Sequence, residues 1–465
     1  MPTNIQLTDP ILDNIQANIL KGHGRDFAHH LFFQFTKGQA LKAKKWIGSF
    51  AWTSAKNQLT ATEQFKSGKI TDGGPIFTLS LSSTGYDRLG LTDLKPGDTS
   101  FDKGMKSSAG LLGDDTALWD EAFGGPVDMM VLVADDDSKN AKTLAANIIS
   151  QTAGFATLLA NQRGNVLKMK GGSGIEHFGY ADGISQPLYL AGDIASQPST
   201  DQWNDETDTA RLLVSDKEEP HHFGSYLVFR KLEQNVKAFK DAEGDNPPIP
   251  SNLPTVKAVD GKPNQELAGA MIVGRFENGT PTVQSSIELN PNPFSVTNDF
   301  DYSSDLSALK CPFHSHIRLM NPRNGDTIAG DVSAQRITRR GIPYDDVQRI
   351  PEDRITTISD DLLDGNQPKE GVGLLFMCYQ SSIKTQFEIM QGFWANEGNI
   401  AGHVVDGQDS LIGRGTNPPK TLPKQWDQPA QSNPFSFHGF VKNKGGEYFF
   451  TPSIGFLRGL AIKTT

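Results

Sequence analysis

The feature that most constrains the fold of this chain is one pattern of strand-like and helical segments that occurs in both of its halves. Apolar strand-like segments alternate with segments whose apolar residues lie three and four positions apart. In the first half the strands are residues 29–35, 74–82 and 127–137, and the helices are residues 40–50 and 138–160. In the second half the strands are residues 225–234 and 373–382, and the helix is residues 384–398. Strands before and after helices in each half predict an α+β fold of two ferredoxin-like domains with antiparallel sheets, rather than a doubly wound parallel sheet.

A polar stretch, AGDIASQPSTDQWNDETD at residues 191–208, interrupts this pattern and marks the expected domain boundary. We therefore expect an N-terminal ferredoxin-like domain at residues 1–200 and a C-terminal ferredoxin-like domain at residues 201–465. The length of 465 residues and the 37% share of hydrophobic residues are sufficient for buried cores in both domains. Asp137 and Ser138 are expected to cap the long helix of the first half.

Charge, hydropathy and cysteine content exclude several classes of protein. The formal charge of −10 argues against nucleic-acid binding, because a phosphate backbone attracts an excess of lysine and arginine. No apolar segment approaches the roughly 18 residues of a membrane span, and the opening residues, MPTNIQLTDP, do not resemble an export signal. The presence of only Cys311 and Cys378 excludes a disulfide framework. We expect no membrane partner, and either a cytoplasmic protein or the mature form of a secreted one.

The common catalytic and cofactor-binding signatures are absent from this sequence. It contains no G-x-x-x-x-G-K-[ST], H-E-x-x-H or G-x-S-x-G motif and no paired C-x-x-C. The run GGSGIEHFG at residues 171–179 does not match G-x-G-x-x-G, because residue 177 is histidine. The sequence also has no C-x-x-C-H motif, so any haem would be bound non-covalently.

Two dense stretches carry groups that could act in chemistry. The first is EHFGYADGISQP at residues 176–187, in which Asp182 lies between glycines; taken alone, Asp182-Gly183 is a turn. The second is CPFHSHIRLMNPR at residues 311–323. Cys311, His314 and His316 have ligand types that suit zinc. Alternatively, Cys311 is a buried apolar residue and the segment presents a single imidazole ring.

Three further stretches add a cation, an apolar strand and a second carboxylate. In RITRRGIPYDD at residues 336–346, the pair Arg339 and Arg340 is typical of a solvated face or of a carboxylate partner. In GLLFMCYQ at residues 373–380, Leu374 and Phe376 are predicted on one face of a strand, with Leu375 and Met377 on the other face. In GQDSLIG at residues 407–413, Asp409 lies between glycine turns.

Taken in this order, the five stretches resemble the dye-decolorizing peroxidases, a family of haem b enzymes. The motifs that carry the resemblance are G-x-x-D-G at Gly179 to Gly183, C-P-F-x-x-H-I-R at Cys311 to Arg318, R-x-G-I-P-Y at Arg339 to Tyr344, and G-L-L-F at Gly373 to Phe376. The segment NIQANILKGHGR at residues 14–25 is also similar to the opening of this family. The resemblance implies two ferredoxin-like domains, with non-covalent haem b (protoporphyrin IX iron) in the C-terminal one, reached by a channel near the domain junction.

The resemblance also assigns roles to individual residues. His316 matches the proximal iron ligand, Asp182 the distal carboxylate and Arg339 the distal arginine. Leu374 and Phe376 match the apolar pair of the haem pocket, and Arg318 resembles a partner of a haem propionate, or else is a surface cation. Asp409 resembles the acid behind the proximal histidine, although Ser410 replaces the usual proline. Asp345 stands where a glycine often follows the tyrosine.

These roles agree with what a peroxidase requires. An imidazole whose second nitrogen donates to a carboxylate is an electron-rich iron ligand, which favours O–O cleavage and a high-valent iron intermediate. Asp182 can move a proton between the oxygens of hydrogen peroxide, and Arg339 can stabilise the charge on the leaving oxygen. We therefore predict a haem peroxidase that uses hydrogen peroxide to oxidise dyes, phenols and other bulky or small reductants.

Two further expectations concern the reducing substrates. Dyes are too large for a pocket that fits peroxide, so Tyr344 and Trp394 are candidates for surface residues that carry electrons to them. The acidic loop at residues 344–364 could bind and oxidise Mn²⁺ through Asp345, Asp346, Glu352 or Asp360, because Mn²⁺ prefers carboxylate ligands. The alternative for this loop is a solvated acidic surface.

Two other functions remain open at this point. A haem-binding or haem-processing protein of the same fold would have incidental peroxidase activity, and it would have no use for Asp182 and Arg339 as a pair. A zinc protein that uses Cys311 and the neighbouring histidines would not absorb visible light.

Overall fold

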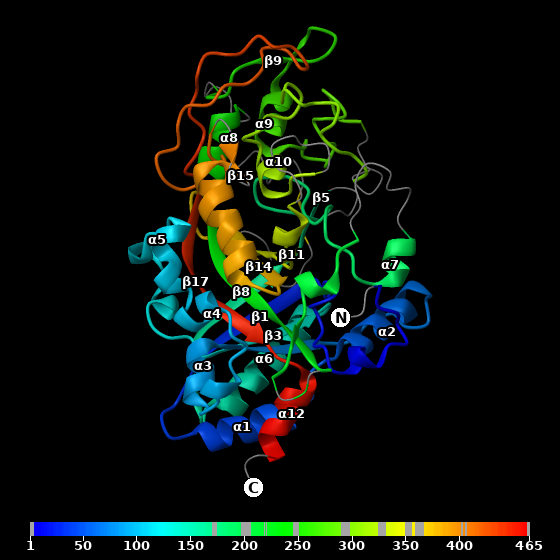
Figure 1. Ribbon diagram of the computed structural model, residues 1–465, viewed down its shortest axis with the longest axis vertical. Helices are drawn as coiled ribbons and strands as arrows, with labels where there is room; N and C mark the ends of the chain where they lie inside the picture. The colour runs from blue at the N-terminus through cyan, green and yellow to red at the C-terminus, as the bar shows by residue number, and fades with distance from the viewer. Residues whose placement is uncertain are drawn as a thin grey trace.

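The computed structural model describes residues 4–169, 174–196, 206–217, 219, 221–244, 251–289, 298–323, 332–348, 356–358, 367–400, 403–404 and 407–462 (Figure 1). Within these ranges no helix is long and apolar enough to cross a membrane. The architecture is α+β, with two ferredoxin-like halves, as the strand and helix pattern predicted.

The N-terminal half contains four antiparallel strands in the spatial order β4-β1-β3-β2. Two helices follow β1, and one connects β3 to β4, which is the βαββαβ order of a ferredoxin-like unit. The strands are β1 (Phe27–Phe35), β2 (Ile76–Ser82), β3 (Met129–Asp135) and β4 (Ala156–Asn165). The helices are α1 (Ala40–Ser49), α2 (Ala55–Lys66) and α6 (Ser138–Thr152), and the β2–β3 connection holds α3 (Ser83–Arg88), α4 (Thr99–Lys103) and α5 (Ala109–Leu112).

The start of α6 was predicted correctly, but its end was not. The Asp137 carboxylate accepts hydrogen bonds from the backbone N–H groups of Lys139 and Asn140, so Asp137 is the N-cap. The helix ends at Thr152, whereas the sequence pattern extended it to residue 160. The apolar residues from Ala156 onward belong to β4, where pairing with β1 gives their backbone a different set of hydrogen bonds.

The C-terminal half repeats the strand order with larger insertions. Its strands pair antiparallel in the order β11-β14-β8-β17, and β12 also pairs with β14. These strands are β8 (Phe223–Gln234), β11 (Thr338–Arg339), β12 (Ile342–Asp345), β14 (Val372–Gln380) and β17 (Val441–Thr451). The insertion between β8 and β11 contains α8 (Val236–Glu243), α9 (Gln265–Val273) and α10 (His316–Met320). The helix predicted at residues 384–398 is present as one continuous helical segment at residues 383–397, with widened, π-helical turns at Ile383–Phe387 and Met390–Ala395.

The two halves form one continuous sheet. Strand β17 pairs with β8 on one side and with β2 on the other, through Phe449 opposite Ser82 and Phe450 opposite Leu81. The far ends of the sheet also meet, because a Cβ atom at Gly164 of β4 would lie 2.4 Å from the Ile342 side chain of β12. The sheet therefore curves round a shared core in which the Phe32 ring lies 4.7 Å from the Phe229 ring, between centroids.

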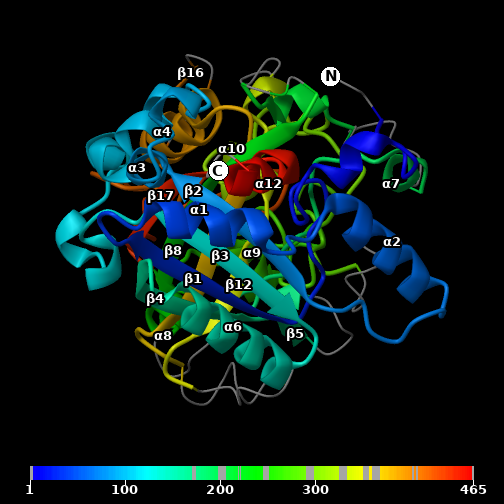
Figure 2. The ribbon, with the colours of Figure 1, turned by 90° about the horizontal axis from the view of Figure 1, so that it is seen from below.

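The last helix of the chain packs on the first half. Helix α12 (Ile454–Ile462) lies beside α1, as Figure 2 shows from below. A Cβ atom at Gly48 would be 2.5 Å from the backbone nitrogen of Ala461, so the two helices touch through backbone. This segment lies within the expected C-terminal domain at residues 201–465, whereas its packing partner α1 belongs to the N-terminal half.

Short elements complete the described chain. Most of them form small sheets apart from the main one, and one two-residue strand pairs with β8. They are β5 (Leu167–Met169), β6 (Gly174–Ile175), β7 (Val214–Ser215), β9 (Val256–Lys257), β10 (Pro263–Asn264), β13 (Thr356–Ile358), β15 (Asn399–Ile400), β16 (His403–Val404) and α7 (Ala191–Ala195).

Candidate active site

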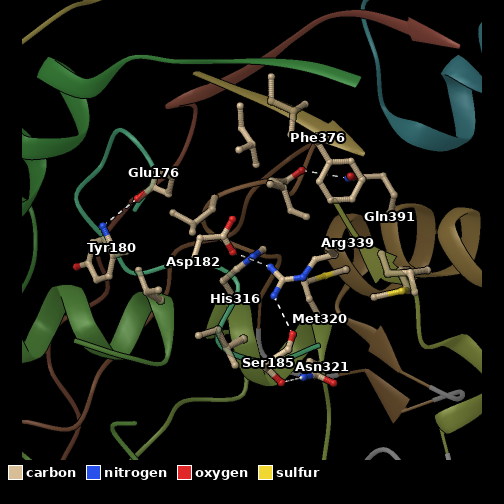
Figure 3. Close-up of a pocket in the computed structure, with 18 of the residues that line it drawn as sticks. Glu176, Tyr180, Asp182, Ser185, His316, Met320, Asn321, Arg339, Phe376 and Gln391 are labelled. Carbon is tan, nitrogen blue, oxygen red and sulfur yellow. Dashed lines mark hydrogen bonds and ion pairs between the residues drawn. The ribbon is translucent and has the colours of Figure 1, made fainter. Parts of the chain in front are cut away.

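All five sequence stretches singled out for their chemistry contribute residues to the lining of one cavity. Figure 3 shows Asp182, His316, Arg339 and Phe376 around it. About 260 Å³ of this cavity is accessible to the centre of a water molecule. The predicted site residues that line it are Asp182, His316, Arg339, Leu374, Phe376 and Trp394. Most of the remaining wall is apolar, with contributions from Leu232, Val273, Ile317, Phe387 and Leu411.

Strand β14 presents its two faces as the sequence predicted. Leu374 and Phe376 line the cavity, whereas Leu375 and Met377 are fully buried in the shared core. The alternation arises because successive side chains of a strand point to opposite faces of the sheet.

His316 is the first residue of α10 and is held by a carboxylate. Its Nδ1 atom lies 2.7 Å from Oδ2 of Asp409, which is completely buried. The backbone N–H groups of Leu411 and Ile412 donate to the other oxygen of Asp409, at 2.8 and 2.9 Å. Burial acts to raise the pKa of Asp409, but the His316 ring and these N–H groups outweigh it, so the pKa lies below its ordinary value.

This arrangement leaves the second nitrogen of His316 available. No group among the described residues hydrogen-bonds to Nε2, and about a quarter of the side chain, 26%, is exposed. A carboxylate on Nδ1 fixes the tautomer in which Nδ1 carries the proton and Nε2 has a free lone pair. The replacement of proline by Ser410 leaves the loop able to make this contact, although the Ser410 hydroxyl is buried and has no hydrogen-bond partner among the described residues.

Asp182 and Arg339 are brought together across 157 positions of sequence. Arg339 donates from Nη1 to Oδ1 of Asp182 at 3.1 Å, and both side chains remain about one-third exposed, at 35% and 36%. The turn that carries Asp182 requires glycine on both sides, because Gly179 and Gly183 have φ angles of +99° and +78°. The pair therefore presents a carboxylate and a guanidinium to the same cavity.

The two adjacent arginines point to different environments. Arg340 is buried and donates to three backbone carbonyls, those of Asn18 at 2.7 Å, Ile19 at 2.9 Å and Arg339 at 2.8 Å. Burial lowers the pKa of Arg340 to about 10. The expectation of a solvated or carboxylate-bound pair is therefore wrong for Arg340. These contacts give the N-terminal segment at residues 14–25 a structural role, because its carbonyls bind Arg340 and so hold the strand that carries Arg339.

Sequence reasoning missed Glu176, which also lines the cavity. Its carboxylate accepts hydrogen bonds from the backbone N–H groups of Phe178 at 2.8 Å and Tyr180 at 3.0 Å, and from the Gln234 amide. Burial raises the pKa of Glu176 to about 7. The only available signal was its position six residues before Asp182, in the same stretch.

Arg318 does not lie in the cavity, contrary to the sequence prediction. Its side chain is 1% exposed, and Nη1 donates to Asp305 at 3.0 Å and to the carbonyl of Cys311 at 2.6 Å. Arg318 is therefore neither a surface cation nor a cavity-lining residue. Four residues before it in sequence, His314 is also buried, with Nε2 3.1 Å from the carbonyl of Thr421.

The described residues do not support the zinc interpretation. Among them, no group of three or more His, Cys, Asp or Glu side chains has the geometry of a metal site. Cys311 is buried and His314 uses Nε2 for a backbone carbonyl, so His316 alone presents an imidazole to the cavity.

Tyr344 and Trp394 are not surface residues, so that part of the prediction is wrong. Tyr344 is 1% exposed, because it lies on the inner face of β12 in the shared core. Its hydroxyl has no hydrogen-bond partner in the described chain, and Nζ of Lys231 lies 4.9 Å from its ring centroid. Trp394 is 3% exposed and lines the cavity, where it packs with α10 and the widened turn that follows β14.

The acids proposed for Mn²⁺ are only partly described. Asp345 is buried, with 9% of its surface exposed, and Asp346 forms an ion pair with Lys231 at 2.7 Å. Glu352 and Asp360 lie outside the described residues, so Mn²⁺ binding stays a prediction.

Fold and cavity together define a class of protein. It is an α+β protein of two ferredoxin-like halves, in which a carboxylate-bound histidine and an aspartate–arginine pair line one largely apolar cavity. This is the combination that the sequence predicted for a peroxidase.

Comparisons with known proteins agree with this class. A family model described as the DyP dimeric alpha+beta barrel domain matches residues 14–168. The multifunctional dye peroxidase DyP2 of Amycolatopsis sp. is 36% identical over 468 residues, which cover 97% of this chain and 96% of that protein. A dye-decolorizing peroxidase of Mycena epipterygia is 31% identical and is matched over 97% of this chain and 87% of its own length. The crystal structure of a DyP-type peroxidase from Anabaena sp. superposes with a TM-score of 0.86 at 35% identity, over 98% of this chain and 97% of that one.

The chain belongs to the dye-decolorizing peroxidase family, and it is a peroxidase and hence an oxidoreductase.

Proposed function

We propose that this protein binds haem b non-covalently through His316 and uses hydrogen peroxide to oxidise dyes, phenols and other reductants. The observation that carries the proposal is the convergence of two pairs on one cavity, His316 with Asp409 and Asp182 with Arg339. The relatives whose names include dye peroxidase activity support the choice of substrate class.

The residues present fit a haem. A planar, mostly hydrophobic macrocycle requires apolar walls, and the cavity provides Leu374, Phe376 and Phe387 among others. Its iron requires one neutral imidazole, and Nε2 of His316 is the ring nitrogen without a partner among the described residues. The charge-assisted hydrogen bond to buried Asp409 makes that ligand more electron-rich.

When bound, the haem supplies the electrons with which the O–O bond of peroxide is cleaved. The protein's part is to move one proton and to stabilise one developing charge. The Asp182 carboxylate accepts the proton from the peroxide oxygen that will remain, and returns it to the oxygen that leaves as water. The Arg339 guanidinium, 3.1 Å from the same carboxylate, stabilises negative charge on the leaving oxygen.

Large reducing substrates do not react inside the cavity where peroxide is cleaved. A cavity with about 260 Å³ of accessible volume does not admit a bulky dye beside a haem. Trp394 lines the cavity and lies in the same helical turn as Phe393, which is 40% exposed. We infer that electrons from large substrates enter through this turn, whereas small phenols react closer to the cavity.

The iron-ligand assignment is tested by substituting each histidine of the C-P-F-H-S-H stretch. His316→Ala removes the proposed protein–iron bond, so the purified protein should lose haem or bind it far more weakly. His314→Ala removes a buried ring whose one hydrogen bond among the described residues is to the Thr421 carbonyl, and it should keep the haem spectrum. The measurement is the visible absorbance spectrum of each reconstituted protein, with circular dichroism to verify folding. The opposite pattern of loss would show that the wrong histidine has been chosen, and no haem binding by the parent protein would refute the proposal.

A haem-storing protein of the same fold is separated from a peroxidase by a second measurement. Addition of one equivalent of hydrogen peroxide to the haem-loaded parent should change its spectrum rapidly. A haem-storing protein does not need Asp182 and Arg339 for a reaction. If this protein has that function, the parent should react with hydrogen peroxide no faster than variants in which Asp182 or Arg339 is replaced.

A further inference from the structure

Ser185 connects two parts of the site that lie far apart in sequence. Its hydroxyl oxygen accepts hydrogen bonds from Nδ2 of Asn321 at 3.0 Å and from Nη2 of Arg323 at 3.3 Å. Its backbone carbonyl accepts a hydrogen bond from Nη2 of Arg339 at 3.1 Å. Figure 3 shows the contacts of Ser185 with Arg339 and Asn321 at one side of the cavity.

The two donors to the Ser185 hydroxyl belong to the segment that follows the histidine helix. Asn321 is the C-cap of α10, five residues after His316. Arg323 is 2% exposed and is held in place by the backbone carbonyls of Asn298 at 2.6 Å and Phe300 at 3.0 Å. This segment is therefore a fixed point of the structure, and the Ser185 hydroxyl is attached to it.

The other side of the connection is the arginine of the site. Arg339 contacts the loop of Ser185 three times, through Asp182, through the Ser185 carbonyl, and through its own backbone N–H, which donates to the Gln186 side chain at 3.1 Å. The Arg339 side chain is one-third exposed, so no tight packing restricts its rotamers. These hydrogen bonds are what fixes the direction of the guanidinium.

We propose that Ser185 is a positioning residue that sets the placement of Arg339 relative to His316. The hydroxyl anchors the loop of residues 182–186 to the end of α10, and the loop then holds both members of the Asp182–Arg339 pair. A small displacement of a group that stabilises developing charge is costly, because the interaction depends on a donor at hydrogen-bonding distance. The inference rests on the proposed function, since it assigns Ser185 a part in the peroxide step.

The test compares three variants of the haem-loaded protein. Ser185→Ala removes the hydroxyl and keeps the carbonyl, and we expect its reaction with hydrogen peroxide to slow about tenfold. Ser185→Thr keeps a hydroxyl and should restore most of the rate. Ser303→Ala is the matched control, because among the described residues the exposed Ser303 hydroxyl bonds only to Asp301 in its own turn, at 2.6 Å. The rate is measured by stopped flow as the absorbance change on mixing with peroxide.

A double-variant cycle separates positioning from general damage. If Ser185 acts through Arg339, then adding Ser185→Ala to Arg339→Leu should cause no further loss of rate. A full tenfold loss in the Arg339→Leu background would overturn the proposal, and so would a parent-like rate for Ser185→Ala alone. If Ser185→Ala does not fold, Asn321→Ala removes the shorter of the two hydrogen bonds to the Ser185 hydroxyl and keeps that from Arg323. Its peroxide rate should fall by less than tenfold, with no further loss in the Arg339→Leu background, and a parent-like rate would overturn the proposal.

A readout that needs no haem completes the test. In a crystal structure of cofactor-free Ser185→Ala, the Arg339 side chain should leave the carbonyl of residue 185, and an unchanged contact would contradict the inference. This result also distinguishes the two proposals. A parent protein that neither binds haem nor reacts with peroxide refutes the proposed function, whereas a reactive parent with an equally reactive Ser185→Ala refutes the role of Ser185 alone.

Discussion

The Asp182–Arg339 pair should be important for the peroxide step and nearly irrelevant to folding. Asp182→Asn keeps the shape of the side chain but cannot accept a proton at neutral pH, and Arg339→Leu removes the cation and keeps much of the apolar stem. Neither residue is the proposed iron ligand. Both variants should therefore fold and bind haem, and they should differ from the parent in their reaction with hydrogen peroxide.

The geometry of the pair indicates how large the effects on stability and on the peroxide rate should be. The pair is joined by one hydrogen bond of 3.1 Å between side chains that are about one-third exposed. Ion pairs of this kind contribute about 0–1 kcal/mol to the free energy of unfolding, because water screens the charges. A positioned acid–base group contributes about 10²–10⁴-fold in rate, which is about 2.7–5.4 kcal/mol of the activation free energy. Each substitution should therefore raise the activation free energy of the peroxide step by several times more than it lowers the free energy of unfolding.

The assay is stopped-flow mixing of each haem-loaded variant with hydrogen peroxide, beside thermal unfolding of the same samples. We expect unfolding curves close to that of the parent and peroxide rates lower by about 10²–10⁴-fold for Asp182→Asn. Arg339→Leu should lose as much or more if charge stabilisation dominates. If Asp182→Asn reacts as fast as the parent while Arg339→Leu is inactive, the proton-transfer role of Asp182 is wrong, and Asp182 is a turn residue that shapes the cavity.

Three other predictions concern pH and electron transfer. Burial raises the pKa of Glu176 from 4.5 to about 7, so the folded state holds a proton that the unfolded state releases between these values, and the contribution of Glu176 to stability falls as pH rises through this window. Glu176→Gln should remove that dependence, and a difference in unfolding free energy between parent and variant that stays constant from pH 4.5 to 7 would contradict the assignment. Trp394→Ser should slow oxidation of a bulky dye more than oxidation of a small phenol, because Trp394 lines the cavity next to Phe393, which is exposed. Tyr344→Phe should affect neither substrate, since its hydroxyl lacks a described acceptor for the proton that an oxidised tyrosine releases, and a selective loss of dye oxidation in this variant would show otherwise.

The fold was predictable from sequence to the extent that local patterns decide it. The five predicted strands were located to within a few positions, because burial of one or both faces leaves a direct mark on residue type. Strands β4 and β17 were not predicted. The end of α6 was missed because residues 156–160 are compatible with a helix, and only pairing with β1 selects the strand. The edge-to-edge union of the two sheets through β17 and β2 depends on contacts between residues more than 360 positions apart, for which a single sequence has no local signal.

The site was predictable where a motif specifies a chemical role and unpredictable where burial decides. Asp182, His316, Arg339 and Asp409 were named from motifs, and the structure brings them together as two bonded pairs. Exposure was not predictable in the same way. Tyr344 and Trp394 are amphipathic side chains whose position relative to the surface depends on the closure of the sheet and on the packing of α10, not on their neighbours in sequence.

The neighbouring arginines show how one short stretch serves both the fold and the chemistry. Arg339 faces the cavity, where its only described side-chain partners belong to the loop of residues 182–186. Arg340 turns the other way and holds the carbonyl of Arg339 together with two carbonyls of the N-terminal segment. The backbone of Arg339 is thus fixed from the N-terminal half, while its side chain is fixed from the Ser185 loop, which is itself tied to the end of the His316 helix. A reactive group on a short strand can be placed accurately only when backbone and side chain are both restrained, and in this protein those restraints come from three segments that no single motif contains.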